Sequence, residues 1–169
     1  MNSILKHFKI INSKRQPPNL KHILTKAKFT EKLELDKTIS KCNRPNCGLC
    51  TYLLEGCEYT FKCGLTFKVK TDISCNVKNI IYAIVCQGCG KEYIGETSHM
   101  RNRITVHKQQ IKVPSTRILK VSKHLDDCSS TEPKFLVFPF YKLTTDNAIM
   151  RKRKENLFIK KLKPELNCH

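Results

Sequence analysis

The sequence contains no hydrophobic run long enough to cross a membrane. Its longest uninterrupted apolar stretch runs from Ile80 to Cys86 and covers seven residues, whereas a membrane-spanning helix needs about 20. The stretch 1–6 is interrupted by Lys6 and lacks the apolar core of a secretory signal. Internal repeats and low-complexity tracts are also missing. These absences argue against a membrane protein and against a secreted one.

Acidic residues are few in this chain. There are 14 Asp and Glu against 32 Lys and Arg, which gives a net charge of +18 over 169 residues. An excess of this size favours a polyanionic partner, above all nucleic acid; the alternative is a basic piece of a larger protein. The apolar fraction of 40% can support a core, and the length suits one domain with an appendage.

The composition divides the chain into three segments. Residues 1–41 form a basic leader without cysteine, in which apolar residues after Pro17-Pro18 predict a short amphipathic helix at Leu20, Ile23, Leu24 and Ala27. Residues 42–77 hold six of the ten cysteines, with short strands expected near 59–61 and 65–69. This segment is too small to bury a core of its own, so we expect a metal to hold it.

Residues 78–169 carry the pattern of the main domain. The β-branched run 80–85 predicts a buried strand, and 91–95 predicts a second strand joined to it by a turn at 87–90. Helices are expected at 98–111 and 116–125, and a strand at 135–141 that lies at an edge because of Pro139. A last helix over 146–162 is expected to be capped by Thr145 or Asp146 and ended by Pro164. This order predicts an α+β fold with a three-stranded antiparallel sheet flanked by helices.

The cysteines predict structural zinc. Two C-x-x-C pairs, Cys47/Cys50 and Cys86/Cys89, have the spacing of zinc knuckles. Four more cysteines bring the count between 42 and 89 to eight: Cys42, Cys57, Cys63 and Cys75. The alternatives are a redox pair, disulfides or buried free thiols. Cys128 and Cys168 are expected to stay unligated. The predicted zinc ligands, whose pairing stays open, are Cys42, Cys47, Cys50, Cys75, Cys86 and Cys89.

Several residues of the main domain have spacings that point to a catalytic site. Tyr82 and Tyr93 lie on the two hairpin strands, with ten residues between them. Arg103 and His107 are four apart on the next helix and therefore share a face. Glu155 falls in the apolar stripe of the last helix, where a carboxylate is costly unless something pairs with it. The alternative for Glu155 is a structural ion pair with Arg151.

These residues resemble the GIY-YIG nuclease superfamily. The resemblance rests on Ile80-Ile81-Tyr82, Tyr93-Ile94-Gly95, Arg103-x-x-x-His107, Glu155 and Asn167. The first glycine of the superfamily motif is Ile80 here. The chain more closely resembles the GIY-YIG endonuclease of Penelope-like retrotransposon polyproteins. That likeness is carried by Asn19-Leu20-Lys21, the Cys42 to Cys50 spacing, the block 75–95 and the stretch 151–167.

The resemblance implies a metal-dependent DNA endonuclease that nicks its target so that reverse transcription can start there. Glu155 would bind one Mg²⁺ or Mn²⁺, and Arg103 would contact the phosphate oxygens. Tyr82 or Tyr93 would orient or deprotonate the attacking water, with His107 as the rival base. Asn167 would position the leaving group.

The resemblance also implies partners and a compartment. DNA would lie on basic residues, expected to be Arg101, Lys108, Arg151, Lys152, Arg153 and Lys160. The run 151–154 is also typical of a nuclear-localisation signal, so we expect the nucleus. An RNA template and an upstream reverse transcriptase domain would be further partners. The alternatives are an inactive zinc-dependent nucleic-acid-binding module and a structure-specific repair nuclease of the same superfamily.

Overall fold

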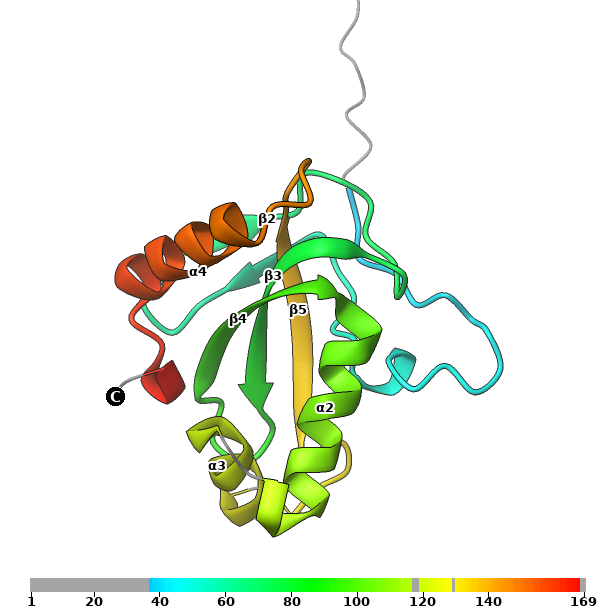
Figure 1. Cartoon of the computed structure of the whole chain (residues 1–169), viewed down its shortest axis with the longest axis vertical. Helices are drawn as coiled ribbons and strands as arrows, with labels where there is room; N and C mark the ends of the chain where they lie inside the picture. The colour runs from blue at the N-terminus through cyan, green and yellow to red at the C-terminus, as the bar shows by residue number, and fades with distance from the viewer. Residues whose placement is uncertain (1–36, 117–118, 129, 168–169) are drawn as a thin grey trace, which may run out of the picture. The chain divides into compact units, whose positions relative to one another are not determined.

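The computed structural model describes residues 37–116, 119–128 and 130–167 (Figure 1). The helix predicted at 20–27 lies outside the described residues. None of the described helices is both long and apolar enough to pass through a membrane. The elements are η1 (Cys50–Tyr52), β1 (Glu58–Thr60), β2 (Thr66–Lys68), β3 (Lys78–Cys86), β4 (Glu92–His99), α2 (Met100–Lys112), η2 (Pro114–Thr116), α3 (Lys120–Cys128), β5 (Phe135–Lys142), α4 (Ala148–Leu162) and η3 (Glu165–Asn167).

The central sheet has the strand order β4-β3-β5, and both pairings are antiparallel (Figure 1). β3 takes the middle position because its apolar run has no polar face: residues 80–84 are all buried. β5 contains Pro139, which cannot donate to a ladder, and it lies at an edge. Helices α2 and α4 contact β3 and β4. The predicted α+β fold is therefore confirmed.

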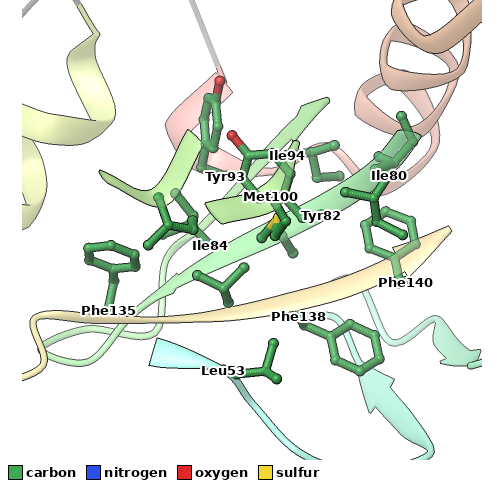
Figure 2. Close-up of a cluster of buried hydrophobic side chains, with 14 of the residues drawn as sticks. Leu53, Ile80, Tyr82, Ile84, Tyr93, Ile94, Met100, Phe135, Phe138 and Phe140 are labelled. Carbon is green, nitrogen blue, oxygen red and sulfur yellow. The ribbon is translucent and has the colours of Figure 1, made fainter. Parts of the chain in front are cut away.

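The cysteine-rich segment packs directly onto the sheet. β1 and β2 form a small antiparallel hairpin, and Leu54 donates a backbone hydrogen bond of 2.9 Å to Val137 of β5. Figure 2 shows Leu53 beside Phe138 in the buried cluster. The segment therefore shares one core with the sheet and is held by apolar packing, which the prediction of a metal-held segment did not include. Its buried residues include Leu49, Leu53, Phe61, Val69 and Ile73, and Ile39 just before the segment is buried with them.

Helix α4 begins at a different residue from the one expected. The N-cap is Asn147, whose side chain accepts a hydrogen bond from the backbone N–H of Met150 at 3.1 Å. The predicted caps Thr145 and Asp146 are therefore wrong. Asp146 instead pairs with Arg151. The helix ends with Lys163 in the left-handed conformation, directly before Pro164, as the sequence predicted.

Candidate functional site

The centre of the site is the hydroxyl of Tyr82, on β3. It accepts a hydrogen bond from Nε of Arg103 at 2.9 Å and lies 2.9 Å from Nε2 of His107. Arg103 and His107 both come from α2 and reach Tyr82 from the same face of that helix, as their spacing predicted. The side chain of Tyr82 is fully buried. The strand and the helix thus bring the first tyrosine, the arginine and the histidine into one hydrogen-bonded chain.

Glycine at position 95 makes room for this arrangement. Gly95 lies opposite Tyr82 in the β3–β4 register. A Cβ atom at Gly95 would lie 2.7 Å from the hydroxyl of Tyr82 and 2.9 Å from Cε1 of Tyr93. Both distances are too short for a carbon atom, so any side chain here would displace one of the two tyrosine rings. The glycine after the second tyrosine is therefore explained by the close approach of both rings to the backbone.

Burial fixes the protonation states of the Tyr82 and His107 side chains. Burial raises the pKa of Tyr82, while burial and the neighbouring Arg103 cation lower the pKa of His107 to about 3. At neutral pH the phenol is therefore protonated and the imidazole is neutral. Because Arg103 can only donate, the phenol hydrogen is free to be donated to Nε2 of His107. The hydrogen bonds then run from Arg103 through Tyr82 to His107.

The predicted pH behaviour follows from His107. Its pKa is about 3 in the folded chain against an ordinary value of 6.5 for a solvated histidine, so on acidification the unfolded chain takes up this proton first. The contribution of His107 to stability is therefore complete above pH 6.5 and is lost as the pH falls from 6.5 towards 3.

We expect the unfolding free energy of His107→Gln to fall less than that of the wild type between about pH 7 and pH 4, as measured by urea unfolding. Metal loss in acid affects both proteins, so the difference between the two curves is the readout. His99→Gln, a change at an exposed position, is the matched control. Parallel curves for His107→Gln and wild type would contradict a neutral, buried His107.

A cleft lies beside this buried chain of hydrogen bonds. Two cavities of about 480 Å³ and 330 Å³ share the lining residues Tyr93, Lys152 and Glu155. Asn167 lines the larger cavity and Arg103 the smaller one. Four of the six predicted catalytic residues thus meet at the cleft. The other two, Tyr82 and His107, are buried and are linked to the cleft by hydrogen bonds through Arg103. The tyrosine that lines the cleft is Tyr93.

Glu155 is buried, with 4% of its surface exposed, and its carboxylate contacts the ammonium group of Lys152. The alternative partner considered for Glu155, Arg151, is held elsewhere. Its guanidinium donates to Glu96 at 2.9 Å, to Asp146 at 2.7 Å and to Asn79 at 2.9 Å. The structural Glu155–Arg151 pair is therefore wrong. The predicted DNA contact of Arg151 does not fit its buried side chain, which donates to these three acceptors.

Asn167 fastens the chain after α4 to the free edge of β4. Its amide nitrogen donates to the carbonyl of Ile94 at 2.8 Å, and its amide oxygen accepts from the N–H of Ile94 at 2.6 Å. The carboxylate of Glu165 accepts a hydrogen bond from the backbone N–H of Glu92, two residues before Ile94 on β4. Both side chains occupy backbone groups that a sheet edge would otherwise leave unpaired. In this structure the side chain of Asn167 therefore has an anchoring role, and its predicted role at the leaving group stays a prediction.

The other predicted DNA contacts differ in their surroundings. Arg153 and Lys160 are exposed on α4, and Lys152 is paired with Glu155. Lys108 lies over the ring of Tyr52, with its ammonium 4.9 Å from the ring centroid. Arg101 points its guanidinium at cysteine sulfurs, which does not fit the predicted DNA contact.

Residues 78–167, more than half of the chain, match the GIY-YIG catalytic domain. The chain belongs to the GIY-YIG family. Neither the curated proteins nor the solved structures give a match. Membership implies a nuclease of the GIY-YIG superfamily, hence a metal-dependent hydrolase with a nucleic-acid substrate.

This GIY-YIG chain also has two clusters of side chains that could hold a metal ion. Within each, the ligand atoms all lie within 4.8 Å of one another. Cys50 Sγ is 3.6 Å from that of Cys42 and 3.5 Å from that of Cys75. Tetrahedral zinc with Zn–S bonds of about 2.3 Å needs sulfurs roughly 3.8 Å apart, so the residues fit this metal. The first cluster is Cys42, Cys47, Cys50 and Cys75; the second is Cys86, Cys89, His124 and Cys128.

The cluster membership refines the zinc prediction. The two C-x-x-C pairs belong to different clusters, and the expectation that Cys128 stays outside any site is wrong. His124 was missed, although it lies four residues before Cys128 and so on the same face of α3. Its Nε2 is 3.3 Å from the sulfur of Cys89. Among the described residues, Cys57 and Cys63 belong to neither cluster. Cys168 lies outside the described residues.

We expect the purified protein to carry two equivalents of zinc without added metal, because each cluster offers a complete set of four ligands. Elemental analysis of freshly purified protein measures this directly. Cys128→Ser should lose one equivalent, whereas the matched change Cys57→Ser should keep both. Folded wild-type protein without zinc would contradict the prediction.

Proposed function

We propose that this chain is a Mg²⁺- or Mn²⁺-dependent DNA endonuclease that hydrolyses a phosphodiester bond and nicks its target. The observation that carries the proposal is the meeting of Tyr93, Arg103 and Glu155 at one cleft, with Tyr82 and His107 bonded behind Arg103. An inactive binding module has no need for this convergence. The role of each residue follows from its position.

Arg103 is suited to stabilise the charge on the phosphate. Its N–H donors are shared between Tyr82 and Tyr93, and a guanidinium can present its remaining donors to non-bridging oxygens in a forked geometry. Because Tyr82 fixes Nε, the rest of the guanidinium is held in place before the substrate arrives. Such preorganised donors stabilise a transition state without reorganisation at the moment of reaction.

Tyr93 is placed to orient the attacking water, because it is the tyrosine that lines the cleft. Burial raises its pKa, so at neutral pH it acts through its hydroxyl group as a hydrogen-bonding partner. His107 is the neutral group that can accept a proton. The Arg103 cation contributes to its low pKa, and a bound phosphate would offset that cation. DNA binding is therefore expected to make His107 a stronger base.

Glu155 would hold the catalytic metal. Its carboxylate offers the hard oxygen ligand that Mg²⁺ and Mn²⁺ prefer, and a cation that keeps several waters can be bound by one carboxylate. When bound, the metal supplies Lewis-acid stabilisation of the leaving oxygen. Lys152, which now contacts Glu155, would then be released to bind a phosphate together with Arg153 and Lys160.

We further infer that the nick starts target-primed reverse transcription for a Penelope-like retrotransposon, in the nucleus. This part rests on the resemblance of the cysteine spacing and of the stretch 151–167, and on the exposed cations Lys152 and Arg153 within the basic run. An RNA template and a reverse transcriptase domain would then be partners. The zinc clusters would brace β3 and extend the DNA surface.

The test is the chemistry of the nicked end. Target priming needs a free 3′ hydroxyl, so a reverse transcriptase added after nicking should extend the cut strand from the cleavage position. Sequencing of the extended products locates each start. Nicks that carry a 3′ phosphate, and so cannot be extended, would contradict target priming while leaving the nuclease activity in place.

A further inference from the structure

Helix α2 begins beside the first cysteine cluster. Arg101, its second residue, directs one guanidinium nitrogen to the sulfur of Cys42 at 3.6 Å and to that of Cys47 at 3.7 Å. Cys75 and Arg101 line a common cavity with Met100, and the N–H of Met100 donates to Val77 at 3.3 Å. The N-cap residue His99 makes no side-chain capping bond, and no acidic residue lies in the first turn. Thiolates in this cluster would therefore place negative charge beside the start of the helix.

The same helix carries two of the proposed catalytic groups. Arg103 follows Arg101 by two residues, and His107 lies one turn further on; both hydrogen-bond Tyr82. The first turn of α2 is thus held at two points, by the cysteine sulfurs on one side and by the Tyr82 hydroxyl on the other. A movement of this turn away from the sulfurs would also move Arg103 and His107 relative to Tyr82.

We propose that Arg101 is a positioning residue that links the first metal cluster to the active-site helix. Zinc bound by four thiolates carries a net negative charge, and the Arg101 guanidinium offsets it by donating to two of the sulfurs. In doing so it ties the metal-bound loops to the start of α2. The first cluster thereby sets the placement of Arg103 and His107 against Tyr82. The inference rests on the proposed function only where it concerns the rate of nicking.

The experiment compares Arg101→Gln with Lys112→Gln, which removes the same charge from an exposed residue at the other end of α2. Zinc release to a chromogenic chelator should be about tenfold faster for Arg101→Gln, the size expected for losing an outer partner of a metal ligand. The nitrogen-15 resonances of the His107 ring should shift in Arg101→Gln and not in Lys112→Gln. At saturating DNA, the single-turnover nicking rate of Arg101→Gln should fall about tenfold or more. Its DNA affinity should equal that of Lys112→Gln.

A second variant traces the effect to the cluster. In a Cys42→Ser background, the further change Arg101→Gln should move the His107 resonances less than it does in the wild type, because one of the two sulfur partners of Arg101 is already lost. If Cys42→Ser does not fold, the comparison of Arg101→Gln with Lys112→Gln decides whether Arg101 is a positioning residue. The proposal would be overturned if Arg101→Gln matched Lys112→Gln in zinc release and in its His107 resonances and lost only DNA affinity. Arg101 would then be a phosphate contact. If the wild type does not nick at all, the proposed function fails, and these two readouts still decide the role of Arg101.

Discussion

Glu155→Gln is expected to lower the single-turnover nicking rate by about a hundredfold or more, while DNA affinity stays the same or rises slightly. The substitution keeps the shape of a buried side chain but removes from it the charge that binds the metal, so the leaving oxygen loses its Lewis acid. Losses of this size are typical when one electrostatic partner of a transition state is removed. Affinity does not fall, because a negative charge next to the DNA has been removed.

Glu58→Gln is the matched control, since it makes the same charge change at an exposed residue on β1. Binding of Mn²⁺, followed by its electron paramagnetic resonance signal, gives a readout independent of activity and should weaken only in Glu155→Gln. Near-normal nicking by Glu155→Gln would reduce Glu155 to the structural counter-ion of Lys152. The proposed site would then rest on Tyr93, Arg103 and the buried groups behind them.

Tyr82→Phe is expected to have the second large effect. Loss of the hydroxyl leaves Nε of Arg103 and Nε2 of His107 without the partner that now holds both. We expect the nicking rate to fall about a hundredfold or more, as when a preorganised donor is lost. Stability should fall by about 1–3 kcal/mol, because a buried polar group is left unpaired. Single-turnover nicking and thermal unfolding measure the two effects.

Tyr59→Phe separates the two effects. The hydroxyl of Tyr59 donates to the buried Glu92 at 2.8 Å, so its removal also leaves a buried group with one partner fewer. Tyr59 lies on β1 and donates to Glu92 rather than to a member of the Tyr82 chain, so its loss should reduce stability without changing the nicking rate per folded molecule. Equal rates for the two variants at equal folded concentration would make Tyr82 a structural residue only.

The fold was largely predictable from sequence because apolar runs, turn residues and capping residues indicate its helices and strands locally. The β-branched run 80–85 predicted a buried strand, and Pro139 placed its strand at an edge. The N-cap of α4 was misplaced because Thr145, Asp146 and Asn147 are all good capping residues. Local sequence does not say which of them starts the helix.

The errors in the site share a different cause, which is contact between distant segments. In the run 151–154 every side chain is basic, and the burial of Arg151 depends on acceptors from Asn79, Glu96 and Asp146. His124 and Cys128 become ligand candidates only when α3 lies against the turn after β3. The anchoring role of Asn167 likewise needs the free edge of β4. Only the i, i+4 spacing of His124 and Cys128 leaves a signal in the sequence, and it does not say which other ligands they meet.

The most direct test of the central claim uses supercoiled plasmid and the zinc-loaded wild-type protein, with and without added Mg²⁺ or Mn²⁺. We expect nicked circles to accumulate only when one of these ions is present. Omitting the ion, rather than adding a chelator, keeps both zinc clusters intact. Folded, zinc-loaded protein that produces no nicked circles with either ion, even in molar excess over the plasmid, would contradict the claim that this cleft is a working nuclease site.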